Sequence, residues 1–325
     1  MDTVQAKDSI ITEPKITLPT GRQKLVDEHV FLIGRPPLDE YLGFLTVQTV
    51  EGQSADHRIL ADEWRSANDH IQELEKKETG LADKPLISSL PSSLQSLGSK
   101  VTTDPIFKRS FNIVPATIGM VELDRLVVFQ KQINLAYVHS LKDTLGMAPN
   151  EETVFKMCLP FDHPRPLVSQ MRVAGNAYMF VSPSTDLRFL EPTLLESTQI
   201  IGYQSQGLVS GIVGLVVGFG SNFLNAVYAE GRLILNNGSH RAYALREMGF
   251  THVPCIIQHV SRREELGIIA SDGLKQSPDL YLKEPRPPLL KDYFDPKLRK
   301  LVTVPRKMRQ VRISFGVESI DIPAA

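Results

Sequence analysis

The chain has few of the residues that build disulfide or metal scaffolds. Its two cysteines, Cys158 and Cys255, cannot form a disulfide framework, and no CxxC motif or paired Cys/His spacing predicts structural zinc. His252 and His259 are an odd number of positions apart on one predicted strand, so they face opposite sides and form no metal pair. We therefore expect a reducing compartment and no structural zinc.

Targeting, membrane and common catalytic signatures are also missing. Residues 1–8 contain no basic region followed by an apolar stretch, so no secretory signal is predicted and we expect a cytoplasmic protein. Residues 208–219 are too few to cross a bilayer, which needs roughly 18 to 20 apolar residues, and we expect a buried strand there and no membrane contact. The P-loop, G-x-S-x-G, H-E-x-x-H and strand-following G-x-G-x-x-G patterns are absent, which excludes the commonest competing enzyme classes.

Neither sign of charge is in excess. The 36 Lys and Arg residues against 37 Asp and Glu give a net charge of -1, so no global field draws the protein to nucleic acid. One local exception is a C-terminal segment without acidic residues. If residues 304–313 form a strand, its basic side chains either contact nucleic acid or protect a sheet edge from aggregation. The basic residues of this segment are Lys297, Arg299, Lys300, Arg306, Lys307, Arg309 and Arg312.

The apolar content, 42% of 325 residues, is enough for one large or two modest domains. Residues 1–20 show no periodicity and are predicted to form a mobile tail. Residues 21–100 are predicted to be mainly helical, because apolar residues recur every three or four positions from Leu60 to Leu74. The turn-forming stretch 88–99 is the predicted boundary with the next region.

Residues 101–325 are predicted to form an α+β domain with a basic C-terminal extension. Apolar spacing predicts one long helix over residues 123–145, ending at Gly146. Beyond Pro149, short apolar runs broken by Gly, Pro and Asn predict a small sheet. The predicted strands are residues 178–181, 211–219, 223–228, 232–235 and 253–258.

The segment 230–257 is the most informative part of the chain. It predicts a strand, a sharp turn, a short helix over residues 240–248 and a second strand. Gly238 is free to adopt a positive φ in the turn, Ser239 is a favoured N-cap, and Gly249 closes the helix.

This turn is predicted to bind an anion. It brings the unpaired N–H groups of the first helical turn together with the side chains of Ser239, His240 and Arg241. A phosphate there would meet backbone donors, a planar guanidinium and an imidazole that can donate a hydrogen bond or move a proton. A structural interpretation stays open, in which Gly238 only turns the chain, Ser239 only caps the helix and Arg241 forms a surface ion pair.

Over residues 230–259 the sequence resembles the signature of the ParB/sulfiredoxin-like superfamily, the nucleotide-binding ParB N-terminal-like domain. In that family a Gly-x-[His/Arg]-Arg turn opens a helix and a Val-Pro strand follows. The matching residues are Gly238-Ser239-His240-Arg241 and Val253-Pro254. The resemblance implies a small mixed sheet with packed helices, phosphate binding by Gly238, Ser239 and Arg241, and a catalytic His240 that stabilises charge or moves a proton. It also implies ATP or another nucleotide with Mg²⁺ as cofactor.

Two departures limit what the resemblance implies. Sulfiredoxins carry their reactive cysteine where this chain has Ser239, which excludes sulfinic-acid reduction by that chemistry. The partition proteins have Glu-Arg-Arg at the turn, so the Ser-His-Arg sequence here puts CTP selectivity and a DNA-clamp role in doubt.

The family also brings a carboxylate or an arginine to the nucleotide from an upstream strand and loop. The candidate here is residues 181–191, where Asp186 or Glu191 can act as general base or hold Mg²⁺ and Arg188 can bind a phosphate. In the alternative interpretation Asp186 caps a helix and Arg188 is a surface residue.

Together these features predict a nucleotide-binding protein that hydrolyses a nucleoside triphosphate or transfers its phosphoryl group to a small acceptor. Phosphoryl transfer needs mainly positioning and charge neutralisation, which a helix N-terminus, an arginine and Mg²⁺ can provide. One alternative is a non-catalytic, nucleotide-sensing regulator that contacts nucleic acid through the basic C-terminal segment. Another is an interaction scaffold built on the N-terminal helices, with a vestigial site.

Overall fold

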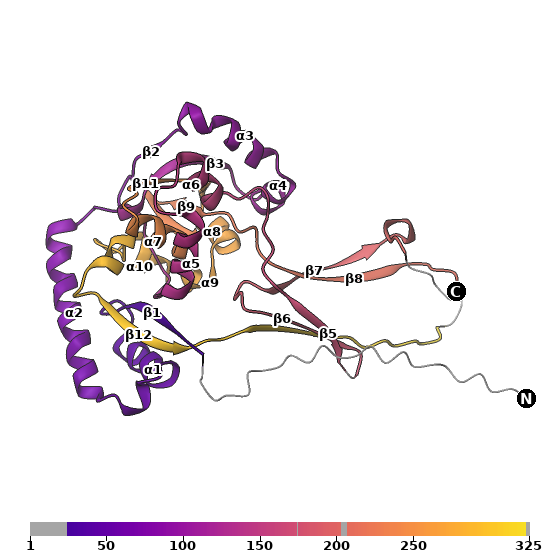
Figure 1. The fold of residues 1–325 in the computed structure, drawn as a ribbon, viewed down its shortest axis with the longest axis horizontal. Helices are drawn as coiled ribbons and strands as arrows, with labels where there is room; N and C mark the ends of the chain where they lie inside the picture. The colour runs from indigo at the N-terminus through magenta and orange to yellow at the C-terminus, as the bar shows by residue number, and fades with distance from the viewer. Residues whose placement is uncertain (1–24, 174, 203–206, 323–325) are drawn as a thin grey trace, which may run out of the picture. The chain divides into compact units, whose positions relative to one another are not determined.

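The computed structural model describes residues 25–173, 175–202 and 207–322 (Figure 1). The predicted tail, residues 1–20, lies outside these residues. The chain divides into two compact units. Unit 2 comprises Leu25–Pro164 and Ser221–Arg306, and the described part of unit 1 lies within residues 165–220 and 307–322. Unit 2 is therefore built from two separate stretches of chain, and the boundary predicted near residue 100 falls inside the first of them.

The main sheet of unit 2 has the strand order β10-β9-β11-β3-β2. Only β9 and β11 run parallel, and the other neighbouring pairs are antiparallel. The largest buried core covers this sheet and includes Val121, Leu233 and Ile256, all 1% exposed or less. The strands are β2 Ile87–Ser88, β3 Ala116–Glu122, β9 Asn225–Ala229, β10 Arg232–Asn237 and β11 His252–His259. The sequence predictions for residues 223–228, 232–235 and 253–258 are confirmed.

A second sheet of unit 2 has the order β12-β1-β4 and is antiparallel throughout. Its strands are β1 Val26–Leu32, β4 Gln132–Asn134 and β12 Arg299–Pro305. Helices α1 Leu38–Gln48 and α2 His57–Glu78 share a buried apolar cluster with this sheet. In α2 the predicted apolar stripe is buried at Leu60, Ala67 and Ile71, so that helix is confirmed.

The remaining helices of unit 2 are short. They are α3 Gln95–Thr103, α4 Pro105–Ser110, α5 Leu135–Leu145, α6 Glu151–Cys158, α7 Ser239–Glu247, α8 Arg263–Ile269, α9 Asp272–Gln276 and α10 Pro278–Leu282. Single 3-10 turns occur at Gly52–Ser54, Ser92–Leu94, Leu123–Arg125 and Leu290–Phe294 in unit 2, and at Ser197–Gln199 in unit 1. Among the described residues, no helix is long and apolar enough to cross a membrane.

Unit 1 contains two small antiparallel sheets. One has the order β13-β6-β5, with β5 Ser169–Val173, β6 Ala177–Ser182 and β13 Arg309–Ser314. The other is a ribbon of β7 Arg188–Leu195 and β8 Ile212–Gly218. The strands predicted at residues 178–181 and 211–219 correspond to β6 and β8. The expectation that residues 208–219 form a buried strand was wrong, since Leu208 and Val213 are exposed. Helices and small sheets together make the fold α+β, as the sequence predicts.

Several predicted elements were wrong. The helix expected over residues 123–145 is a 3-10 turn, the strand β4 and then α5, because Ile133 pairs with Val30 in the second sheet. The loop predicted over residues 88–99 already includes the start of α3. Besides the helices α1 and α2, the region 21–100 contains the strands β1 and β2. The strand expected over residues 304–313 is interrupted, so that β12 belongs to unit 2 and β13 to unit 1.

Candidate functional site

The turn between β10 and α7 is the predicted phosphate site. Gly238 has φ 97°, the left-handed conformation in which a Cβ atom is strained, and it occupies the N-cap position of α7. A Cβ here would lie 3.1 Å from Cγ of Leu224 and 3.2 Å from Nη2 of Arg241, so space as well as conformation favours glycine. Ser239 was predicted to be the N-cap, but it is the first residue of the helix and is buried. Asn237, just before the turn, is exposed.

His240 is held by the backbone of a neighbouring helix start. Its Nε2 accepts a hydrogen bond from the backbone N–H of Asn134 at 3.0 Å, and its ring packs edge-on against Tyr137 with centroids 5.3 Å apart. Burial, with smaller effects from His29 and Arg241, lowers the pKa of His240 to about 4. The ring is therefore neutral at pH 7, and because Nε2 accepts, the proton is on Nδ1.

Arg241 points into the protein and not along its surface. Only 5% of the residue is exposed. Its Nη1 donates to the carbonyl oxygens of Met157, Cys158 and Asn222 at 3.2, 3.2 and 2.6 Å. Two of these carbonyls belong to the last turn of α6, where a cation interacts favourably with the helix dipole. Arg241 therefore does not form the surface ion pair of the structural interpretation. Its buried side chain instead holds α7 against α6 and against the chain before β9, and we call this set of contacts the Arg241 clamp.

A polar network that the sequence did not reveal fixes the end of β10. Oδ1 of Asn236 accepts from the backbone N–H and the hydroxyl of Ser271, both at 2.9 Å. Nδ2 of Asn236 donates to Asn225, which in turn accepts from the buried Gln258. Asn237 donates from Nδ2 to the carbonyl of Phe223 at 3.1 Å. These amide contacts link β10 to residues 11 to 35 positions away in sequence, so no local pattern signals them.

The other predicted site residues belong to unit 1. Asp186 lies between β6 and β7 and accepts from Nη2 of Arg188 at 2.5 Å and from the backbone N–H of Gly220, which follows β8, at 2.7 Å. Asp186 precedes a strand and caps no helix. Glu191 is exposed on β7, where the register with β8 shifts.

A cavity of about 550 Å³ lies elsewhere in unit 2. Its walls include the aromatic residues Phe44 and Phe129 and the amides Gln130 and Gln132. Gln132 belongs to β4, the strand that ends at Asn134, whose N–H binds His240. Strand β4 therefore lines the cavity at Gln132 and binds His240 at Asn134.

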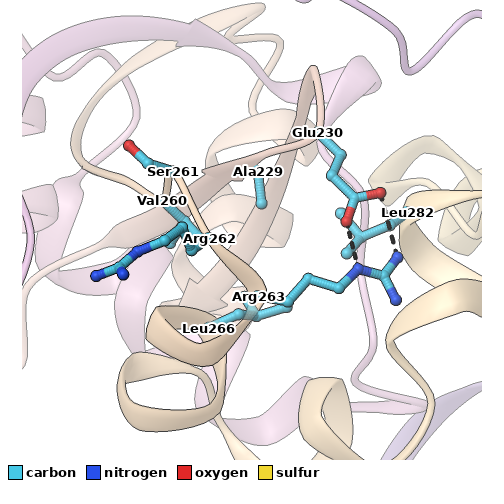
Figure 2. Close-up of a pocket in the computed structure, with 8 residues that line it drawn as sticks. All are labelled: Ala229, Glu230, Val260, Ser261, Arg262, Arg263, Leu266 and Leu282. Atoms are coloured by element: carbon cyan, nitrogen blue, oxygen red, sulfur yellow. Dashed lines mark hydrogen bonds and ion pairs between the residues drawn. The ribbon is translucent and has the colours of Figure 1, made fainter.

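A much smaller pocket of about 70 Å³ lies at the other end of β10 (Figure 2). Glu230 reaches across it to Arg263, whose Nε and Nη2 donate to the two carboxylate oxygens at 2.5 and 3.2 Å. Arg263 also pairs with Asp279 at 2.7 Å. The positive φ of Glu230, 49°, belongs to the tight turn predicted between β9 and β10. The volume is too small for a nucleotide, so this ion-paired pocket is not the predicted site.

The basic C-terminal segment is partly neutralised. Lys300 donates to Glu63 at 2.6 Å and Arg306 pairs with Asp27 at 2.6 Å. Within residues 25–173, 175–202 and 207–322, no group of three or more His, Cys, Asp or Glu side chains is arranged to hold a metal ion.

Comparisons with protein-family models, with curated proteins and with solved structures found no significant match to this chain.

Proposed function

We propose that the turn between β10 and α7 binds the phosphates of ATP or another nucleotide with Mg²⁺. In this proposal the protein hydrolyses the nucleotide or transfers its phosphoryl group to a small acceptor, and the segment 230–259 has the ParB/sulfiredoxin-like fold. The observation that carries the proposal is the left-handed Gly238 at the start of α7. It lets the chain turn directly into the helix, whose first N–H groups have no partner within the helix.

Charge supports the same choice of ligand. The carbonyls of Met157, Cys158 and Asn222 that accept from Arg241 Nη1 are neutral, and they hold the guanidinium in place. A buried cation beneath a helix N-terminus adds to the positive end of the helix dipole. We therefore assign Ser239 and the backbone N–H groups to direct phosphate contact, and Arg241 to a supporting charge held below the turn.

His240 takes a different chemical role from a general base. Because its Nε2 already accepts the Asn134 N–H and its pKa is lowered to about 4, the ring does not take up a proton near pH 7. We assign His240 as a neutral hydrogen-bond donor through Nδ1. We also assign the cavity beside β4, the strand that His240 contacts at Asn134, as the binding site of the acceptor molecule. The proposal needs no contribution from Asp186, Arg188 or Glu191.

The first test is calorimetric titration of the full chain with ATP, ADP, CTP and GTP in the presence of Mg²⁺, followed by phosphate release from any nucleotide that binds. Binding with turnover supports the enzyme, and binding without turnover supports the site but not the activity. Absence of binding to all four contradicts the proposal.

A matched pair of glycine variants tests the turn itself. Gly238→Ala and Gly249→Ala introduce a Cβ at nearly the same positive φ, 97° and 91°, at the two ends of α7. A Cβ at Gly249 has no neighbour within 4 Å, so this variant carries the backbone strain alone. We expect Gly238→Ala to weaken nucleotide binding at least tenfold and Gly249→Ala to leave it unchanged. Equal effects would assign the loss to helix strain and remove the turn from the site.

A second pair tests charge. Asn237→Asp adds a negative charge beside the N-terminus of α7, and Asn150→Asp adds the same charge at the N-cap of α6. Repulsion of the phosphates predicts weaker binding for Asn237→Asp alone, with a larger effect at low ionic strength. If Asn150→Asp weakens binding as much, the ligand does not lie at the turn.

A further inference from the structure

In the two-stranded ribbon of β7 and β8, strand β8 carries no charged residue. The sequence contains no Asp, Glu, Lys or Arg between Glu196 and Glu230, and β8 lies within that stretch. The two strands pair from Arg188 opposite Gly218 to Leu195 opposite Ile212 and lie side by side as one long ribbon (Figure 1). An isolated two-stranded ribbon is marginally stable in water, so this one needs further contacts.

The two outer edges of the ribbon differ. Strand β7 carries Pro192, the charged residues Arg188 and Glu191, and a register shift between Phe189 and Glu191. Proline, charge and bulges are the devices by which natural proteins block pairing at a sheet edge. Strand β8, with the sequence IVGLVVG, has none of them. Within the described residues no strand pairs with its outer edge.

One face of the ribbon is apolar and open to solvent. Leu194 is opposite Val213, and Pro192 is opposite Leu215, so these four side chains lie on the same face. Leu194 is 73% exposed, Val213 70% and Leu215 36%. An apolar strip that continues to an unprotected edge is the feature expected where another strand completes the sheet.

We propose that β8 pairs antiparallel with β8 of a second copy of this chain, so that two ribbons form one four-stranded sheet. A two-fold axis sets one strand against the same strand of the other copy, and a strand without charged residues meets neither like charge nor uncompensated charge in any register. The uncharged β8 can therefore pair with itself, whereas Pro192 and the register shift hinder such pairing of β7. A register centred on Leu215 pairs all residues of the strand and joins the two apolar strips. This interface is independent of nucleotide binding.

Cross-linking tests the register. In the proposed sheet Leu215 faces its own copy, within reach of a disulfide. Leu194 and its copy lie three strand spacings apart, about 14 Å across the sheet, and are also offset along the strands, so no disulfide can join them. The native thiols do not interfere, because Cys158 and Cys255 are fully buried and burial raises the pKa of both. With copper phenanthroline and air as the oxidant, we expect Leu215→Cys to form a disulfide-linked dimer and Leu194→Cys to remain monomeric on non-reducing gels. No cross-link in Leu215→Cys, or equal cross-linking in both, would overturn the proposal.

Sedimentation of the full chain over a range of concentrations tests the association without oxidation. We expect a reversible dimer whose dissociation constant rises at least tenfold in Leu215→Lys, where two ammonium groups meet at the axis, and changes less in Leu194→Lys. A wild-type chain that is monomeric at every concentration, or a dimer insensitive to Leu215→Lys, would overturn the proposal. So would a monomer that floats with anionic lipid vesicles only when Leu215 is intact, since that outcome assigns the apolar strip to a lipid surface.

Discussion

Replacing Arg241 with methionine tests whether this residue is a clamp or a surface ligand. Methionine keeps most of the length and apolar volume but has no donor for the carbonyls of Met157, Cys158 and Asn222. Cys158 keeps a second hydrogen bond, from the N–H of Leu224 at 2.8 Å, and Asn222 is exposed enough to bind water.

The loss of stability therefore comes from the unpaired carbonyl of Met157, from the missing positive charge at the C-terminus of α6, and from altered packing around the buried side chain. Leaving a buried acceptor unpaired costs about 1–3 kcal/mol, and a cation at a partly buried helix C-terminus contributes up to about 2 kcal/mol. We expect Arg241→Met to lower the free energy of unfolding by about 3 kcal/mol.

The assay is urea unfolding followed by circular dichroism at pH 7, with the denaturant slope compared between variants. Arg246→Met on the same helix is the matched control. Arg246 pairs with Asp124 at 3.0 Å with about a third of its side chain exposed, and such pairs contribute less than about 1 kcal/mol. If Arg241→Met and Arg246→Met were equally stable, the clamp would be refuted and direct phosphate contact by Arg241 would become the better assignment.

Two further predictions concern buried ionisable groups. The folded-state pKa of His240 is about 4 against an ordinary 6.5, so the folded protein favours the neutral ring. The neutral ring therefore contributes to the free energy of unfolding in full above pH 6.5, and this contribution is lost as the pH falls toward 4, by up to about 3 kcal/mol. Urea midpoints measured from pH 7 to 4.5 should fall less steeply in His240→Gln, and parallel curves would contradict the assignment. Asp292→Asn removes a carboxylate that accepts twice from the fully buried Arg286, at 2.6 and 2.5 Å, and should cost about 3–5 kcal/mol in the same unfolding assay. The exposed Asp62→Asn is its control, and a similar small effect in both would show that the Arg286 pair is not needed for stability.

Local patterns predicted those elements whose structure depends mainly on nearby residues. The apolar stripe from Leu60 to Leu74 and the turn at Gly238 could be predicted, because helix periodicity and a positive φ depend on residues only a few positions apart. The segment 123–145 failed for the opposite reason. Its apolar residues fit a helix, but Ile133 instead pairs with Val30 in a sheet whose strands come from both ends of unit 2.

The candidate site shows the same division. The sequence named Gly238, Ser239, His240 and Arg241 because they are contiguous. It did not reveal that His240 binds a residue 106 positions away, or that Arg241 binds carbonyls up to 84 positions away. These long-range contacts decide the chemistry, because they set the proton position on the imidazole and keep the guanidinium below the turn.

The clamp at Arg241 also joins two points between which the chain leaves unit 2 and returns. Met157 and Cys158 come before the departure at Pro164, and Asn222 follows the return at Ser221. Both ends of the intervening segment are thus fastened by unit 2 itself, and the entropy cost of closing such a loop grows only slowly with its length. Insertions and deletions between residues 165 and 220 should consequently be far better tolerated than any change at Arg241, because the segment can vary in length while the turn at Gly238 and its clamp stay in place.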